Sequence, residues 1–209
     1  MLLERSMNSA KPVVWYVDNL TSIAQHPISA IGQPSIRNDL SGANVSFDGV
    51  KDGLMVENNP IAGLQAFTVE VLFFPANGGA FEQRFVHLQE HASESRALVE
   101  LRSENDNWYL DTYLHAPRSQ LTLITPKHLH PHDQWYFAAL TYDGTTMRHF
   151  VDAKEEASGR VSFAPLGTGR ASIGVRQNQV SWFRGAVREI RIWPLALEAN
   201  QLQRSCRTG

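Results

Sequence analysis

The sequence predicts an all-β protein, a two-sheet antiparallel β-sandwich of the jelly-roll type with a short C-terminal helix. Short runs of β-branched and aromatic residues recur along the chain, and turn residues such as Asp48-Gly49, Asn77-Gly78-Gly79 and Asp143-Gly144 separate them. No stretch has the apolar spacing of a long amphipathic helix. Since no linker or change of composition divides the chain, residues 1–209 are expected to form one domain.

The expected strands follow one another at short intervals. They are Val13–Val17, Val45–Phe47, Phe67–Phe74, Phe85–Gln89, Ala97–Arg102, Trp108–His115, Gln120–Ile124, Trp135–Tyr142, Met147–Val151, Ser172–Val175, Val180–Arg184 and Val187–Trp193. The segment from Ile23 to Asn38 contains two prolines and is expected to be irregular. Leu195 to Arg204 follow Pro194, which the first turn of a helix tolerates, so they are expected to form the terminal helix.

Composition excludes several classes of protein. Apolar residues make up 43% of the chain, which excludes intrinsic disorder. Lysine and arginine total 19 against 21 acidic residues, so the net charge of -2 gives no drive toward nucleic acid or a membrane surface. Cys206 is the single cysteine, which rules out an intrachain disulfide and disfavours a catalytic thiol. Without a signal peptide or membrane span, the sequence as written predicts a cytoplasmic protein, or a secreted one if a leader has been removed.

Three neighbouring strands in the middle of the chain each have one apolar and one polar face. Side chains alternate between the two faces of a strand, so the apolar sets can close the sandwich core. In the first strand this assigns Val86 and Leu88 to the core and Phe85 to the opposite face. If the strands are adjacent, that opposite face also holds His87, Gln89, Glu100, Arg102, Tyr109, Asp111, Tyr113 and His115.

This polar face has the residue types of a saccharide site. Aromatic rings stack on the C–H faces of sugars, and planar polar groups form paired hydrogen bonds with hydroxyl and carboxylate groups. The alternatives are that a loop covers the face, or that Glu100 and Arg102 only neutralise each other across the sheet. The residues expected to bind glycan are Gln89, Glu100, Arg102, Tyr109, Asp111 and Tyr113, with His87 fixing orientation and Arg176 and Trp182 contributing from later strands.

The same face contains groups that catalysis requires. His87 could move a proton, Tyr113 or Tyr109 could act as general acid or base, and Arg102 could neutralise a uronate. With His87, Arg102 and Tyr113 as the catalytic set, these groups suit β-elimination on an acidic polysaccharide. Hydrolysis is the weaker enzymatic alternative, because it needs a pair of carboxylates at a fixed separation, for which Glu100 and Asp111 are the candidates.

Three histidines alternate near the middle of the chain, at His128, His130 and His132. Alternating histidines can bind zinc. Pro126 and Pro131 place them in a loop, and only Asp133 joins them locally, so the prediction is a solvated loop and no metal site.

From Trp135 onward the sequence resembles the laminin G-like jelly rolls of the concanavalin A-like lectin/glucanase superfamily. The resemblance lies in the ordered runs Trp135–Gly144, Met147–Asp152, Ala171–Gly174 and Phe183–Trp193, followed by Ala196-Leu197, with Val45–Gly49 and Phe67–Val71 matching the opening strands. It covers about residues 44 to 204 and implies a concanavalin A-like sandwich. The order of these runs is specific for fold and not for function.

The departures from family patterns bear on activity. The Glu-x-Asp-x-(x)-Glu strand of the superfamily's glycosidases is missing, which weighs against a laminarinase-type hydrolase. Of the Arg-x-Glu-x-Arg strand of similar alginate lyases only Glu100 and Arg102 are present. Relatives often bind a structural calcium, so calcium is a possibility here, although no cofactor is required.

The favoured function is glycan binding on a concave sheet face. The first alternative is a polysaccharide-degrading enzyme. The second is a protein-interaction domain with an apolar patch near Trp182–Phe183.

Overall fold

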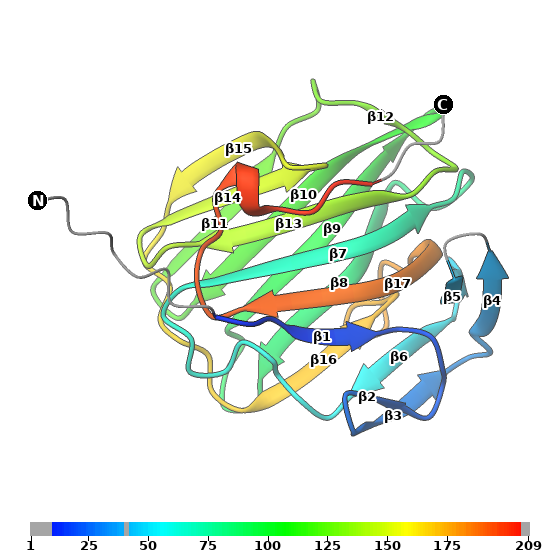
Figure 1. Ribbon diagram of the computed structural model, residues 1–209, viewed down its shortest axis with the longest axis horizontal. Coiled ribbons are helices and arrows are strands. Elements are labelled where there is room, and N and C mark those ends of the chain that lie inside the picture. Colours follow the sequence, from blue (N-terminus) through cyan, green and yellow to red (C-terminus); the bar gives the residue numbers. More distant parts are fainter. Residues whose placement is uncertain (1–9, 40–41, 206–209) are drawn as a thin grey trace, which may run out of the picture.

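Two antiparallel sheets lie face to face in the computed structural model, which describes residues 10–39 and 42–205 (Figure 1). In order across sheet 1 lie β15 (Lys154–Arg160), β14 (Thr146–Val151), β13 (Tyr136–Tyr142), β7 (Phe67–Pro75), β17 (Arg184–Trp193), β5 (Gly42–Asp48) and β4 (Ser35–Asp39), and β1 (Val13–Tyr16) also pairs with β17. In order across sheet 2 lie β11 (Ser119–Ile124), β10 (Asn107–Ala116), β9 (Arg96–Glu104), β8 (Glu82–Glu90), β16 (Gly169–Ile173), β6 (Gly53–Val56), β3 (His26–Ile31) and β2 (Ser22–Ile23), and β12 (His130–Pro131) also pairs with β10. The all-β sandwich that the sequence predicts is confirmed.

Aromatic side chains from both sheets form the centre of the core. Phe73 of sheet 1 stacks on Phe85 of sheet 2, with the ring centroids 4.2 Å apart and the planes 8° from parallel. Trp108 meets Phe73 edge-on at 5.2 Å. All three side chains are fully buried, so they contribute both apolar burial and preferred ring geometry to the stability of the sandwich.

The predicted alternation of faces is confirmed for β9 and β10 and fails at one residue of β8. Ala97, Val99 and Leu101 enter the core, as do Trp108, Leu110 and Leu114. In β8 a bulge between Arg84 and Val86 adds one residue against β9, so Phe85 and Val86 both pack into the core. The prediction that Phe85 lies on the polar face is therefore wrong, and Arg84 takes a place there opposite Glu100.

The structure also corrects several element boundaries. The segment from Ile23 to Asn38, expected to be irregular, contains β3 and β4, which extend the two sheets. Both proline positions are compatible with this, because Pro27 is near the start of β3 and Pro34 precedes the exposed edge strand β4. β6, β12 and β15 were likewise not expected.

Two expected elements are shorter or missing. The strand predicted over Val180–Arg184 is a loop until Arg184, with φ of 60° at Gln179 and 57° at Ser181. The terminal helix is reduced to one 3₁₀ turn, η1 (Ala199–Gln201), which a capping box at Glu198 starts. Within residues 10–39 and 42–205, no helix is long and apolar enough to cross a membrane. Cys206 lies outside the described residues.

Replacing the bulged core residue tests this packing. Phe85→Ala is expected to lower the free energy of unfolding by about 3–5 kcal/mol, because the truncation leaves a cavity against Phe73. Phe81→Ala is the matched control, since this residue is 59% exposed and its ring lies against the Arg102 guanidinium in a cation–π contact, and it should cost less than about 1 kcal/mol. Urea unfolding of both variants measures the difference. Equal losses would show that Phe85 is not central to the core.

Candidate functional site

A pocket of about 200 Å³ opens on the outer face of sheet 2, over β8 to β11. Five of the predicted site residues line it, namely Glu100, Arg102, Asp111, Tyr113 and Arg176. The first four come from β9 and β10, which pair in register with Glu100 opposite Asp111. Arg176 reaches the same pocket from the loop after β16. The adjacency of strands that the sequence argument assumed is confirmed.

Buried acids and arginines alternate across this face. Glu100 lies between Arg84 on β8 and Asp111 on β10, and the Nε atom of Arg84 is 2.6 Å from Oε2 of Glu100. Arg102 donates from Nε to Oδ2 of Asp111 at 2.8 Å. Glu82 forms ion pairs with both Arg84 and Arg102. Glu100 and Asp111 are only 2% and 1% exposed, so the neighbouring arginines offset the desolvation cost of burying these carboxyl groups.

Burial raises the pKa of both acids. Desolvation, followed by the nearby Asp111 carboxylate, raises the pKa of Glu100 to about 8, although Arg84 and Arg102 act in the opposite direction. Desolvation also raises the pKa of Asp111 against the effect of Arg102. Near neutral pH the Glu100 carboxyl is therefore largely protonated and can donate a hydrogen bond.

Arg176 is the cation at this pocket that forms no ion pair with the described residues, although Glu100 and Glu94 attract it from a greater distance. Its side chain is half-buried and forms no ion pair or hydrogen bond with any residue in the part of the chain that the structure describes. Desolvation, with repulsion from Arg96 and Arg84, lowers the pKa of its guanidinium, which nevertheless stays charged at physiological pH. The pocket thus contains an unsatisfied positive charge.

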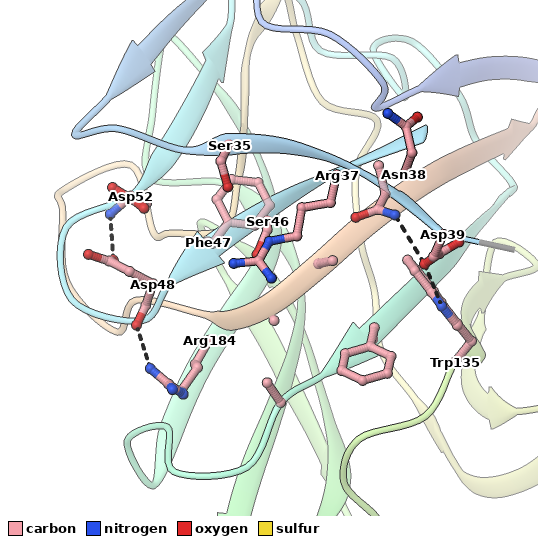
Figure 2. A pocket seen from close by; sticks show the side chains of 15 residues that line it. Ser35, Arg37, Asn38, Asp39, Ser46, Phe47, Asp48, Asp52, Trp135 and Arg184 are labelled. Carbon is pink, nitrogen blue, oxygen red and sulfur yellow. Dashed lines mark hydrogen bonds between the residues drawn. The ribbon is translucent and has the colours of Figure 1, made fainter. Parts of the chain in front are cut away.

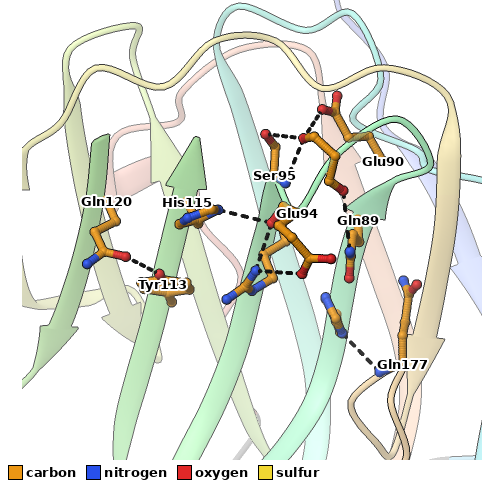
Figure 3. Close-up of polar contacts among 11 residues, drawn as sticks. Gln89, Glu90, Glu94, Ser95, Tyr113, His115, Gln120 and Gln177 are labelled. Atoms are coloured by element: carbon orange, nitrogen blue, oxygen red, sulfur yellow. Dashed lines mark hydrogen bonds and ion pairs between the residues drawn. The ribbon is translucent and has the colours of Figure 1, made fainter. Parts of the chain in front are cut away.

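Tyr113 is held rigidly at the edge of the pocket. Its hydroxyl donates to Oε1 of Gln120 at 2.6 Å, and the Arg96 guanidinium carbon lies 5.3 Å from its ring centroid (Figure 3). His115 stacks beside the same ring at 6.0 Å. Arg96 and His115 thus lie against this ring, and the stacking of a sugar on Tyr113 stays a prediction.

Four predicted residues lie away from this pocket. Tyr109, Gln89 and Trp182 do not line the pocket. Tyr109 is only 5% exposed, and the Gln89 side chain donates to the Ser93 carbonyl at 3.4 Å. His87 is 1% exposed, and its Nδ1 accepts a hydrogen bond from the Gln177 backbone at 3.0 Å (Figure 3). Desolvation, with nearby arginines, lowers the pKa of His87 to about 3, so this side chain is neutral and anchors the loop that carries Arg176.

Four residues that line this pocket were not predicted as site residues from the sequence. They are Arg84, Arg96, Leu98 and Thr122. Arg84 was missed because the bulge reverses its face. Arg96 directly precedes the predicted strand Ala97–Arg102 and shares the parity of Glu100, so extending that strand by one residue would have found it. Thr122 lies opposite Tyr113 in β11.

No group of three or more His, Cys, Asp or Glu side chains that could hold a metal ion occurs among residues 10–39 and 42–205. The alternating histidines serve the fold instead. His130 lies 2.8 Å from Oε1 of Glu156 on β15 of the other sheet, and His132 approaches the hydroxyl of Ser103 at 3.4 Å. The segment predicted to be a solvated loop is thus partly ordered as β12 against β10.

Phe183 does not contribute to the apolar patch predicted near Trp182–Phe183 for a protein-interaction domain. Phe183 is fully buried, and its ring lies 5.5 Å from that of Phe85 in the core. Trp182 is half-buried beside it.

The chain belongs to the concanavalin A-like lectin/glucanases superfamily, because a laminin G family model of this superfamily matches residues 48–203. No protein of curated function matches the sequence.

Solved structures resemble the fold over nearly its full length. Domain 4 of an extracellular arabinanase from Geobacillus stearothermophilus, in complex with arabinotriose, superposes with a TM-score of 0.68 at 17% identity, covering 92% of this chain and 96% of that one. The binding domain of botulinum neurotoxin serotype D gives 0.64 at 13% identity, covering 92% of this chain and 51% of that one. A heptameric SAP-like pentraxin from Limulus polyphemus gives 0.61 at 14% identity, with coverages of 76% and 78%. At these identities the likeness establishes the fold alone.

The raised pKa of Glu100 predicts how stability depends on pH. The folded state holds this proton more tightly than the unfolded state, so the stabilisation is complete below the ordinary pKa of 4.5 and is lost as pH rises through about 8. In Glu100→Gln this contribution disappears. Between pH 5 and pH 8 the wild type should lose roughly 3–4 kcal/mol more of its unfolding free energy than the variant. Urea unfolding at both pH values measures the difference, and parallel pH profiles would show that Glu100 is ionised throughout.

Proposed function

We propose that this protein binds glycan on the outer face of sheet 2, and that the pocket beside Arg176 receives an acidic group of the sugar. The observation that carries the proposal is the half-buried Arg176 guanidinium, which lines the pocket and has no partner among residues 10–39 and 42–205. A carboxylate or sulfate would form charge-assisted, bidentate hydrogen bonds with such a group.

The balance of charge at the pocket favours an anion. Four arginines line it, Arg84, Arg96, Arg102 and Arg176, and the acids within it are Glu100 and Asp111. Because the raised pKa keeps Glu100 largely protonated at neutral pH, the arginines outweigh the acids there. Glu82 pairs with Arg84 and Arg102, and Glu94 pairs with Arg96, but neither acid lines the pocket.

The size and donor set of the pocket suit one sugar substituent. At about 200 Å³ it is smaller than the roughly 300–1,000 Å³ of sites that enclose whole ligands, so the remainder of a glycan would lie across the open sheet. Protonated Glu100 can donate to a sugar oxygen. The buried Oδ1 atom of Asp111 has no hydrogen-bond partner in the described chain, so a hydroxyl group of the ligand could donate to it. The similarity to an arabinanase domain that was solved with arabinotriose agrees with glycan as the ligand class.

Binding is favoured over β-elimination because of His87. The lyase hypothesis needs this imidazole to move a proton at the sugar, but the side chain is buried, does not line the pocket and is committed to the Gln177 backbone. The Tyr113 hydroxyl is likewise engaged by Gln120. His87 thus does not face the pocket, and the Tyr113 hydroxyl, although at the pocket, already donates its proton to Gln120.

Replacing Arg176 tests the proposal directly. Arg176→Ala should weaken binding of an acidic oligosaccharide, such as a trimer of galacturonic or guluronic acid, by about 10-fold or more, because a charge-assisted contact is lost. Its unfolding free energy should change by less than about 0.5 kcal/mol, since Arg176 has no partner to lose. Arg118→Ala, which removes an exposed arginine from the turn between β10 and β11, is the control and should bind normally. Calorimetric titration in low and high salt measures the effect, and unchanged affinity in Arg176→Ala would contradict the assignment.

The choice between binding and elimination has its own test. Incubating the protein with alginate or polygalacturonate should give saturable binding with no rise in ultraviolet absorbance from unsaturated products. A time-dependent rise that Tyr113→Phe abolishes would instead establish the lyase.

A further inference from the structure

A larger pocket, of about 690 Å³, lies on the opposite side of the molecule from the Arg176 pocket. It is formed on the outer face of sheet 1 over β4, β5, β17 and β7, with Trp135 closing one end from the segment before β13 (Figure 2). The site proposed above does not involve any of these elements. Its volume falls in the range of about 300–1,000 Å³ that is typical of small-molecule sites.

Strand register explains why the sheet is hollow here. Ser35 on β4 lies opposite Ser46 on β5, Ser46 lies opposite Ala186 on β17, and Ala186 lies opposite Phe74 on β7. Three small side chains therefore form a row across the sheet, and the large Phe74 stands at the end of that row. The row is the floor of the pocket, and Phe74 starts its wall.

The wall at this end is an aromatic corner. The Phe74 and Trp135 rings meet at 62° with their centroids 5.6 Å apart, and both side chains are only half-buried. The Trp135 indole donates to Oδ2 of Asp39 at 3.2 Å, which fixes its orientation (Figure 2). Buried Asn44 donates to the same carboxylate oxygen, also at 3.2 Å. An oriented, accessible indole next to fixed amide and carboxylate groups offers a stacking surface with hydrogen-bonding groups at its edge.

Arg37 supplies the polar contact across the pocket. Figure 2 shows its side chain reaching from β4 toward the middle of the cavity, and it forms no ion pair or hydrogen bond with the residues that the structure describes. Arg184 on the far side is already held, since its Nε donates to the Asn77 carbonyl at 2.9 Å. Arg37 is therefore the arginine that can donate hydrogen bonds to a ligand, whereas Arg184 forms part of the pocket wall.

From this geometry we infer a second saccharide site, which takes an uncharged oligosaccharide with one sugar ring against Trp135 and Phe74 and its hydroxyls toward Arg37 and the Asp39 carboxylate. The charges favour a neutral ligand, because Asp39, Asp48 and Asp52 offset the two arginines that line the pocket. An anionic chain would meet these carboxylates, whereas hydroxyl groups can both donate to them and accept from Arg37. The inference stands independently of the acidic-glycan site, since the two pockets share no residue.

The test is titration of the full chain with neutral trisaccharides of glucose, xylose, mannose and arabinose, with calorimetry giving the affinity of every variant and NMR at the Trp135 indole N–H locating the site in the wild type. At least one of these probes should shift that resonance in a saturable way. Trp135→Ala should weaken its binding by about five-fold or more, since a stacked ring is lost. Arg37→Ala, at an exposed position whose side chain forms no ion pair or hydrogen bond with the described residues, should weaken binding with little change in the unfolding midpoint.

Two matched variants make the result specific. Trp182→Ala removes a half-buried tryptophan elsewhere and should bind the neutral trisaccharide normally. Arg176→Ala should lose acidic-glycan binding and keep neutral binding, so that failure of one site is distinguished from failure of the other. The inference is overturned if none of the neutral trisaccharides binds at millimolar concentration, or if Trp135→Ala and Arg37→Ala both bind as the wild type does. It is also overturned if only acidic oligosaccharides compete for this pocket.

Discussion

The bulge in β8 is the constraint on which both the core and the Arg176 pocket depend. One extra residue lets Phe85 stack against Phe73 inside the sandwich while Arg84 faces outward beside Glu100. The loop after β16 satisfies the backbone groups that the bulge leaves unpaired in the ladder, because the Arg84 N–H donates to the Ser181 carbonyl at 2.9 Å and the Phe85 carbonyl accepts from Gly174 at 3.1 Å. The residue that completes the core therefore also fastens the loop that brings Arg176 to the pocket.

His87 shows how the same strand supports this loop without contacting a ligand. Its Nδ1 can accept from Gln177 only while the imidazole is neutral there, and burial keeps it neutral by lowering its pKa to about 3. The low pKa thus has a structural consequence, since it keeps Gln177, and with it the adjacent Arg176, in place. A perturbed histidine in a predicted site is often taken as a catalytic base, but here the direction of the shift and the hydrogen-bond partner indicate a positioning residue.

The features that depend on regular alternation of side chains along a strand were predicted correctly from the sequence. The features at an interruption of that alternation were not. Glu100, Arg102, Asp111 and Tyr113 were placed together because β9 and β10 have no bulge and each pairs with its chain neighbour. Arg84 was not predicted to lie at the site, and Phe85 was assigned to the wrong face, because the sequence of β8 does not reveal the bulge. The bulge depends on backbone hydrogen bonds to a loop that is distant in sequence. The pocket on sheet 1 depends on β17 pairing with β5 and β7, which lie more than 100 residues before it in sequence, so its floor and its aromatic corner could not be foreseen.

The polar and charged groups are arranged differently on the two outer faces, and this difference underlies what each face is proposed to bind. On sheet 2 the acids are buried and paired with arginines, so removing them from water raises their pKa and leaves Arg176 as the net charge available to a ligand. On sheet 1 the polar groups surround a wide trough of small side chains, where Asp39 orients Trp135 and remains near solvent. Strong, desolvated charge selects a charged group, whereas a mixed rim around an aromatic surface selects shape and hydroxyl pattern. Under the two proposals above, the sandwich would present an acidic-saccharide site on sheet 2 and a neutral-saccharide site on sheet 1, because the charges at the two pockets differ.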